Sequence, residues 1–390
     1  MDERRTTPVE LLWDLVFVFA VTQVTTLLSS DLTWPGFARA MLVLALVWWA
    51  WSAFVWAANA QASSSGALRV ILLAATVFVF LTGLAVPRAF KNEATLFAAG
   101  YAVVRLLHLA LYADASRKGD AAWSAIAGFA VTVTIGMVLL LAGSFASGAL
   151  RYAMWSAAVA IDYAGPAWLT RERLRGLQQV AVAHFAERYG LFVIICLGES
   201  IVAVGVAAGN GYRPLSATLV VAVGLGVLIT IGMWWTYFGR FAGEAEERLR
   251  RHRDPVLAAA DAYSYLHLVI IAGIIIFDAG IKLLARGAVD APLPGPERLA
   301  LCGGIALYLL GQFASRLRLT GSARYVTASA AAALIALYVA GGGMPAWAVA
   351  AVASGLVGAL CCVESAGEGR SNRRRGRRRR FVPTGGGRID

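Results

Sequence analysis

The chain has 390 residues, of which 59% are hydrophobic and 15% are charged, and its mean hydropathy is +0.67. A soluble domain is about 25% charged, so this composition excludes a soluble multidomain protein and predicts an integral membrane protein. The formal net charge of +12 does not indicate a nucleic-acid partner, because much of it lies in one arginine run near the C-terminus with no folded basic module beside it.

Twelve apolar stretches of membrane-spanning length follow one another along the chain. Since about 20 consecutive apolar residues cross a bilayer as a helix, we predict an all-α, polytopic integral membrane bundle of about twelve transmembrane helices. Residues 1–9 then form an N-terminal segment, 10–363 the transmembrane domain and 364–390 a tail. The predicted spans are 10–28, 38–60, 67–87, 94–113, 122–142, 150–168, 187–208, 215–239, 260–285, 297–315, 323–341 and 345–363.

The basic residues predict which side of the membrane each end of the chain occupies. Cytoplasmic loops carry an excess of Lys and Arg, and most of the 35 Lys and Arg residues lie in the tail or in segments on the same side as the N-terminus. We therefore predict a multi-pass protein of the cell (inner) membrane with both termini in the cytoplasm. The start of the chain resembles an uncleaved first span rather than a removed signal peptide.

The two halves of the transmembrane domain, 10–168 and 187–363, show a weak internal similarity. A shift of 176 residues aligns the first span with the seventh and places Gln23 on Glu199, and tryptophan pairs recur in the second and eighth spans. Two parallel repeats of six spans would explain these matches, and repeat-built transporters bind their substrates between the halves. Chance similarity between apolar helices is the alternative.

The tail, 364–390, is rich in Gly, Ser and Arg and has few apolar residues, so it is predicted to be disordered. Its arginine run, Arg373–Arg380, has two interpretations. In one, the run attracts anionic lipid headgroups at the inner leaflet. In the other, it only fixes the cytoplasmic position of the chain end.

Charged residues inside the spans are the main indication of function, because each costs roughly 2.5–3.5 kcal/mol on insertion scales. In the first span, Glu10 and Asp14 are four residues apart and therefore share one helix face. Two acids so close repel each other unless they share a cation or a proton. For Glu10 alone, the alternative is an interfacial position that the helix N-terminus stabilises.

The fourth span carries one polar stripe with spacings of four, three and four residues, formed by Tyr101, Arg105, His108 and Tyr112. Because an arginine side chain stays charged, Arg105 is predicted to face the bundle interior and to pair with an acid. Asp14 and Asp162 lie at a similar predicted depth. Such a pair has either a structural or a functional role, whereas His108 alone is predicted to be a hydrogen-bonded core histidine.

The seventh span places His184, Arg188 and Glu199 on one helix face at 100° per residue. Glu187 directly precedes Arg188. Glu199 lies near the bilayer midplane between two small residues, and Arg188 is roughly 16 Å away along the axis, too far to neutralise it. Glu199 is therefore predicted to be a proton or cation station, with a purely structural hydrogen bond as the alternative.

The ninth span contains His267, Asp278 and Lys282. Asp278 and Lys282 are four residues apart and are predicted to pair near the outer surface, which is mainly a structural role. His267 lies deeper in the span and is expected to be able to titrate near neutrality.

Several of these segments resemble motifs of a known family. Residues 10–18 and 184–200 are similar to specific motifs of the bacterial low-temperature-requirement protein A (LtrA) family. Further similar segments are 161–166, 234–238 and 265–267. The resemblance covers about residues 6–365 and implies a multi-pass bacterial membrane protein linked to growth in the cold, without implying a molecular activity. Gly239 stands where relatives often have Asp, which argues against a polar role there.

The sequence leaves three functions open. The first is an ion- or proton-coupled transporter or channel for an unknown small solute or ion, with a candidate intramembrane polar site formed by Glu10, Asp14, Arg105, His108, Asp162, His184, Glu187, Arg188, Glu199 and His267. The second is a membrane-embedded enzyme that acts on a lipid or quinone-like substrate with the same groups as acid–base catalysts. The third is a structural or sensory protein involved in cold adaptation.

Short loops and the absence of a soluble-type catalytic motif favour transport over catalysis. No catalytic residue is predicted. The four cysteines have no metal-ligand or disulfide spacing, and no metal or other cofactor is expected. The expected partners are the lipid bilayer and the unknown solute.

Overall fold

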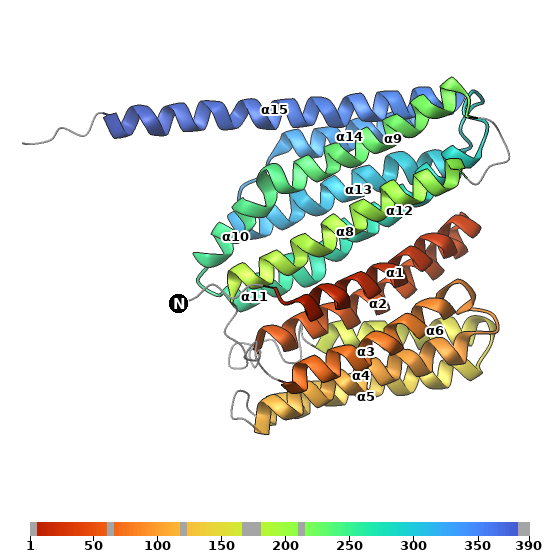
Figure 1. Cartoon of the computed structure of the whole chain (residues 1–390), viewed down its shortest axis with the longest axis vertical. Helices are drawn as coiled ribbons and strands as arrows, with labels where there is room; N and C mark the ends of the chain where they lie inside the picture. Colours follow the sequence, from red (N-terminus) through yellow and green to blue (C-terminus); the bar gives the residue numbers. More distant parts are fainter. Residues whose placement is uncertain (1–5, 61–65, 118–122, 166–180, 210–214, 381–390) are drawn as a thin grey trace, which may run out of the picture.

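The computed structural model describes residues 6–60, 66–117, 123–165, 181–209 and 215–380. These residues are almost entirely helical (Figure 1). Each predicted span corresponds to one long helix: α1 (Pro8–Ser30), α2 (Trp34–Ala60), α3 (Gly66–Ala85), α4 (Ala94–Arg117), α5 (Trp123–Phe145), α6 (Gly148–Ala164), α8 (Val182–Gly209), α9 (Ala217–Thr236), α12 (Leu266–Arg286), α13 (Gly295–Thr320), α14 (Tyr325–Ala340) and α15 (Ala346–Arg380). Short 3-10 turns follow α3 and α14, namely η1 (Val86–Arg88) and η5 (Gly341–Gly343). Ten helical segments of the described residues are long and apolar enough to cross a membrane, and the predicted polytopic helical bundle is confirmed.

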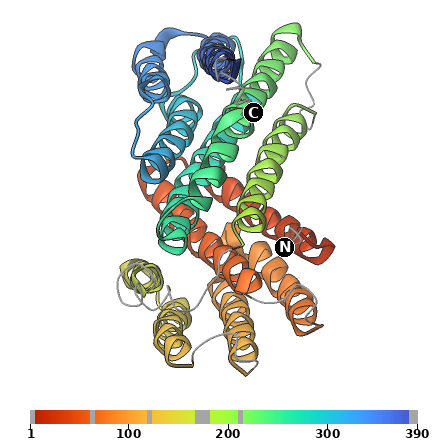
Figure 2. The ribbon, with the colours of Figure 1, turned by 90° about the vertical axis from the view of Figure 1, so that its left-hand side faces the viewer.

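The long helices run roughly parallel or antiparallel to one another and form two groups (Figures 1 and 2). Helices α1–α6 form one group and α8–α15 the other, and α1 and α2 contact α8 and α12 across the boundary. Helix α1 begins at the same end of the bundle at which α15 ends (Figure 1). This end, which the basic residues predict to be cytoplasmic, is called the inner end, and the opposite one is the outer end.

The two groups have the same order of neighbours. In the first group α1 packs on α2 and α3, and the series continues from α3 through α4 and α5 to α6, which returns to α2. In the second group α8 packs on α9 and α12, and the series continues from α12 through α13 and α14 to α15, which returns to α9. This order agrees with the predicted two parallel repeats of six spans, in which α1 is equivalent to α8.

The contact between α12 and α13 is unusually close because glycines face the opposing backbone. A Cβ atom on Gly304 of α13 would lie 2.3 Å from the Phe277 nitrogen, and one on Gly280 of α12 would lie 2.4 Å from the Leu301 nitrogen. Small residues let membrane helices approach closely enough for backbone contact. Helix α12 is therefore held firmly in the second group, and its other face is available to α1 and α8.

The segment between the eighth and ninth predicted spans, 240–259, is helical rather than a short loop. It contains two α-helices, α10 (Ala242–Arg250) and α11 (Pro255–Ala259). Two π-helical segments flank them, η3 (Tyr237–Phe241) before α10 and η4 (Ala260–Tyr265) after α11. The polar helix α10 is stabilised by the i,i+4 ion pairs Glu246–Arg250 and Glu247–Arg251. The π-helical segments join this inner-end structure to α9 and α12.

Helix α15 continues to Arg380, through part of the tail for which the sequence predicts disorder. Arginine has a high helix propensity, and a helix already formed by the last span extends without the cost of a new nucleus. Residues 381–390 lie outside the described residues, and the disorder of the tail stays a prediction.

Candidate functional site

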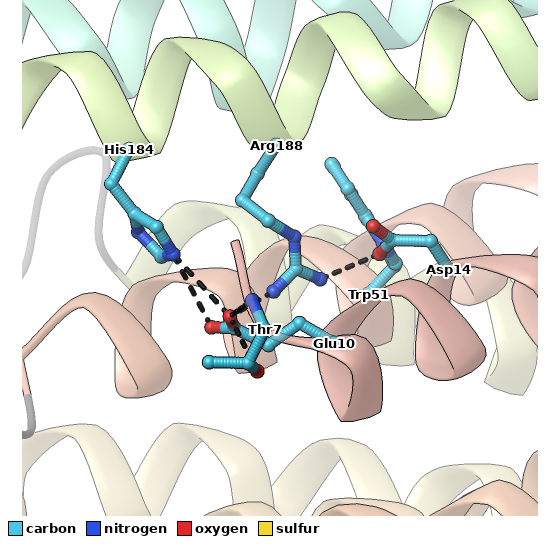
Figure 3. A network of polar contacts seen from close by, with 6 residues as sticks. All are labelled: Thr7, Glu10, Asp14, Trp51, His184 and Arg188. Carbon is cyan, nitrogen blue, oxygen red and sulfur yellow. Dashed lines mark hydrogen bonds and ion pairs between the residues drawn. The ribbon is translucent and has the colours of Figure 1, made fainter. Parts of the chain in front are cut away.

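Four ionisable side chains of α1 and α8 form a buried group near the inner end, here called the inner cluster: Glu10, Asp14, His184 and Arg188 (Figure 3). Arg188 Nη1 lies 3.2 Å from Glu10 Oε1, and Arg188 Nη2 lies 2.5 Å from Asp14 Oδ1. His184 Nε2 lies 3.4 Å from the Glu10 carboxylate. Each of the four side chains is at most 1% exposed. From α2, Trp51 Nε1 donates a hydrogen bond to Asp14 Oδ1 at 2.8 Å.

The first turn of α1 positions Glu10 for this contact. Thr7 precedes the helix and Pro8 is its first residue. Glu10 Oε2 accepts hydrogen bonds from the Thr7 amide at 2.8 Å and from the Thr7 hydroxyl at 2.9 Å, which is a capping box. Glu10 therefore caps the helix N-terminus with one oxygen while its other oxygen reaches Arg188.

The inner cluster joins the two halves of the protein. The cation that Glu10 and Asp14 share is the guanidinium of Arg188, which comes from the second half. Removing one partner of a buried ion pair leaves an uncompensated charge and costs about 3–5 kcal/mol. The contact therefore specifies how α1 and α8 meet, and its charges must separate if the two halves move apart at the inner end.

Arg105 pairs with Asp162 and not with Asp14. Arg105 Nη2 lies 3.2 Å from Asp162 Oδ1, and the Tyr101 hydroxyl donates to Asp162 Oδ2 at 3.4 Å. Arg105 is fully buried and Asp162 is 4% exposed. The prediction that Arg105 faces the bundle interior beside an acid is confirmed, and the pair joins α4 to α6 within the first half.

Two of the predicted site histidines are surrounded by core side chains. His108 is fully buried, with its ring centroid 5.5 Å from that of Phe54. His267 Nδ1 donates to the Ala262 carbonyl at 2.7 Å, and His267 Nε2 accepts from the Tyr237 hydroxyl at 2.8 Å. This tautomer follows from the hydrogen-bond partners. A neutral His267 is fully hydrogen-bonded, which favours a structural role over the expected titration.

A second polar group, here called the middle cluster, lies about halfway along three helices and consists of Thr22, Glu199, Ser200, Asp278 and Lys282. Glu199 lies beside Thr22 of α1, and Asp278 of α12 lies against the Ser200 hydroxyl of α8. Asp278 is 2% exposed, and its Oδ1 has no hydrogen-bond partner among the described residues. The predicted Asp278–Lys282 ion pair does not form, because Asp278 turns toward α8 while Lys282 stays partly exposed.

The same spacing between polar residues occurs on two helices, although His267 itself is not part of the inner cluster. Eleven residues separate Arg188 from Glu199 on α8 and His267 from Asp278 on α12. Eleven residues cover about three turns, roughly 16 Å, and return to the same helix face. Buried apolar side chains occupy the three turns between the clusters, among them Val18 and Val21 of α1, Phe192 and Val193 of α8, and Ile271 and Ile274 of α12. The polar groups therefore form two layers separated by an apolar one.

Comparison with known proteins connects this arrangement to a family. Residues 5–362 match the family described as Bacterial low temperature requirement A protein (LtrA). The chain belongs to the LtrA family. It is 30% identical to RA0937, an uncharacterized protein of Rhizobium meliloti (strain 1021), over 324 residues that cover 80% of this chain and 76% of the relative. No solved structure matches this LtrA-family chain.

Glu187 lies outside both clusters of this LtrA-family protein. It is exposed and lines a cavity next to Tyr237 and Tyr263. The LtrA-like segment 184–200 thus presents different faces to different surroundings, with Arg188 toward the inner cluster and Glu187 toward the cavity. The sequence places Glu187 among the candidate site residues but does not show the cavity, because its other walls come from distant segments.

Sequence reasoning missed a set of uncharged polar residues between α2, α8 and η4. Ser52 Oγ lies 2.8 Å from Tyr189 Oη and 3.0 Å from Ser264 Oγ. Trp48 Nε1 donates to the Ser264 carbonyl at 2.6 Å, and Trp56 Nε1 donates to Ser264 Oγ at 2.7 Å. Hydroxyls and indoles are common in apolar spans, so only the tryptophan-rich segment around Ser52 could have indicated this network.

Proposed function

We propose that this multi-pass membrane protein is a proton-coupled transporter in which Asp278 and Glu199 hold and release the coupling proton. The observation that carries the proposal is the buried Asp278 carboxyl, with one unpartnered oxygen among the described residues, at the middle of the bundle. It lies where α1 of the first half meets α8 and α12 of the second. Repeat-built transporters hold their coupling ions at such interfaces, and intramembrane acids commonly serve as proton relays.

The chemistry of the middle cluster favours a proton over a metal cation. Hard cations need about six or more oxygen ligands, whereas this cluster offers two carboxyl groups and two hydroxyls. Lys282 acts electrostatically on both Glu199 and Asp278 and would repel a metal ion. Among the described residues, no group of three or more His, Cys, Asp or Glu could hold a metal. A proton needs a single carboxyl oxygen and removes the cost of an unpaired buried charge.

The inner cluster is suited to act as a gate at the inner end during proton-coupled transport. The apolar layer between the clusters interrupts any continuous polar path from Asp14 to Asp278. A carrier of this kind has to rearrange its halves to connect the middle cluster with the inner end. Because Arg188 joins the halves at that end, separation of its ion pairs would accompany opening.

Proton flux into reconstituted vesicles tests the proposal. The protein is reconstituted with a pH-sensitive dye inside, and a membrane potential or a gradient of candidate solutes is imposed. Asp278→Asn and Glu199→Gln keep the side-chain shapes and remove the titrating groups, so both should fold and lose proton movement. Asp290→Asn removes an exposed acid just beyond α12 and should keep it. Full proton movement in Asp278→Asn would overturn the proposal, and so would a wild-type protein that moves no protons with any solute.

Infrared spectroscopy provides a second readout that needs no transported solute. A protonated carboxyl group has a C=O stretch that an ionised one lacks. The wild-type protein should show such a band that changes with pH, and Asp278→Asn should remove it. A structural role for Asp278 would instead be shown by a substituted protein that no longer elutes as a folded monodisperse species.

The orientation of the protein is part of the proposal. The inner end is placed in the cytoplasm because most basic residues lie there, and the arginine run of the tail, Arg373–Arg380, is then positioned to attract anionic lipid headgroups. Reporter fusions after residues 250 and 290 should report the cytoplasm and the outside, respectively. The reverse result would overturn this orientation.

A further inference from the structure

A cavity of about 320 Å³ opens at the inner end between α8 and the segment that connects α9 with α12. It lies on the face of α8 that bears Glu187, away from the inner cluster. The residues that determine its chemistry are Glu187 and Gly190 of α8, Tyr237 and Phe238 of η3, Glu246 of α10 and Tyr263 of η4. The cavity is therefore built by one span of the second half and by both π-helical segments.

The two π-helical segments give the cavity its shape. Single π-helical turns inside α-helices are rare and are frequent at functional sites. Here η3 places Tyr237 and Phe238, and η4 places Tyr263, on the walls of the same cavity. Small residues leave the space open, because a Cβ on Gly190 would only touch the Phe238 ring at 3.5 Å and one on Gly243 would meet nothing within 4 Å.

The aromatic walls are fixed in place from behind. The Tyr263 ring stacks on His267 with a centroid distance of 4.7 Å and an interplanar angle of 11°. The Tyr237 hydroxyl is held by His267 Nε2 at 2.8 Å, and the Tyr237 ring packs edge-on against Phe238 at 4.8 Å. Tyr237 and Tyr263 are only 1% and 2% exposed, so the partly exposed Phe238 is the ring that a ligand in the cavity would contact most directly. Rings held in this way form a preorganised wall that loses little conformational freedom when a ligand binds.

The charge of the cavity is negative. Glu187 is exposed and forms no ion pair among the described residues. Glu246 pairs with Arg250 at 2.7 Å, but both side chains are well exposed, at 34% and 43%, so this pair is weak. No Lys or Arg is among the described residues that line the cavity. Two acids at the mouth therefore face a wall of aromatic rings.

We propose that this cavity binds a small amphipathic organic cation, an ammonium group with apolar substituents. Aromatic faces attract such cations when their charge is within about 6 Å of the ring, and Glu187 and Glu246 supply the opposite charge. Inorganic cations are poorly served, because the walls apart from the two carboxylates offer rings and methyl groups rather than the six or so oxygen ligands that such ions need. A volume of about 320 Å³ lies at the lower end of the usual range for small-molecule sites.

Binding at this cavity does not depend on transport. If the protein is the proposed transporter, small organic cations are the expected class of substrate. Tyr237 connects the cavity with His267 on α12, the helix that also bears Asp278.

Equilibrium binding of benzyltrimethylammonium to the full-length protein in nanodiscs tests the inference. Isothermal titration calorimetry should detect binding of benzyltrimethylammonium to the wild-type protein. It should detect no binding of phenylacetate, which has a similar ring but a negative charge. Neopentylbenzene, the neutral isostere of the probe, should bind at least about ten-fold more weakly. Equal affinity for the neutral isostere would overturn the inference, because the cavity would then be only an apolar pocket.

Substitutions place the binding in this cavity. The double substitution Glu187→Gln and Glu246→Gln should weaken binding about ten-fold or more, and Phe238→Leu should weaken it roughly 2–30-fold. Glu247→Gln is the matched control, because it removes the same charge one residue further along α10, outside the cavity. An unchanged affinity of the folded double variant would overturn the inference.

The outcomes separate this inference from the proposed transport. Asp278→Asn should abolish proton movement and leave benzyltrimethylammonium binding unchanged. A protein that binds the probe but moves no protons would support the binding site and reject the transporter. A protein that moves protons but does not bind the probe would support the transporter and reject the binding site.

Discussion

Replacing Arg188 by methionine tests how strongly the inner cluster holds the two halves together. The guanidinium contacts both acids of α1, at 3.2 Å for Glu10 and 2.5 Å for Asp14. Methionine keeps much of the apolar stem and removes the charge. The variant leaves two carboxylates on one helix face, each at most 1% exposed, while Glu10 keeps its contacts with Thr7 and His184.

The expected loss is large because the acids lose their shared cation and cannot reach water. Breaking a buried ion pair costs about 3–5 kcal/mol, and here one substitution breaks two such contacts. We therefore expect Arg188→Met to lower the free energy of unfolding by about 5 kcal/mol. The triple variant that also carries Glu10→Gln and Asp14→Asn should recover most of this loss, since a neutral buried site is often as stable as a paired one.

Unfolding in a titration with sodium dodecyl sulfate, followed by far-ultraviolet circular dichroism, measures these differences. Arg39→Met is the matched control: Arg39 pairs with Asp31 at 2.6 Å, but the side chains are 24% and 31% exposed, so the loss should stay below about 1 kcal/mol. The reasoning is refuted if Arg188→Met costs no more than Arg39→Met. It is also refuted if the triple variant is no more stable than Arg188→Met.

Three further predictions concern other parts of the molecule. Asp162→Asn leaves the buried Arg105 without its acid and should cost about 3–5 kcal/mol in the same titration, whereas an effect below 1 kcal/mol would contradict the pairing. Gly304→Ala places a Cβ 2.3 Å from the backbone of α12 and should cost roughly 1–3 kcal/mol by overpacking; unchanged stability would show that the two helices separate easily. Hydrogen bonds from Thr33 lower the pKa of Asp31, which lies between the first two spans. The ionised Asp31 side chain therefore stabilises the fold at pH values above its ordinary pKa of about 3.9. This stabilisation is lost as the pH falls through the lowered pKa. Thr33→Val should raise that pKa, as followed by carboxyl carbon NMR, and an unchanged titration would contradict the hydrogen bonds.

The spans could be predicted from the sequence, because length and hydropathy directly determine which segments cross a membrane. The predicted span 10–28 becomes α1 with two more residues at each end. Other bounds differ more: α9 is shorter than the span 215–239, and α12 begins six residues after the start of the span 260–285. The segment 240–259 was expected to be a loop because its residues are polar. Its i,i+4 ion pairs and its contacts at the inner end make it helical instead.

The candidate site could be predicted only where the spacing along one helix decides the outcome. The shared face of Glu10 and Asp14 predicts a shared cation or proton, and in the structure both acids contact one cation. The identity of that cation, Arg188, depends on which helices are neighbours, and a single helix does not contain that information. The same reason explains why both Asp14 and Asp162 were open as partners of Arg105 until the packing was known.

The π-helical segments could not be predicted, because the analysis of helix faces assumes 100° per residue throughout. Each π-helical turn shifts the following side chains around the axis. The shift at η4 brings Tyr263 and Ser264 to different surroundings, one to the cavity and one to the indoles of α2. Residues within or beyond such a turn, including Phe238 and Tyr263 of the cavity walls, can therefore be placed only from coordinates.

The division of charge in the inner cluster has a consequence for biosynthesis. The first half leaves the ribosome with its acids, Glu10 and Asp14, long before Arg188 is made. Two first halves from neighbouring chains would oppose acid to acid, and two second halves would oppose arginine to arginine, so both mispairings are disfavoured by like-charge repulsion. An interface between identical units has to be self-complementary, but this one is not. The charges therefore favour pairing of a first half with a second half over pairing of two like halves.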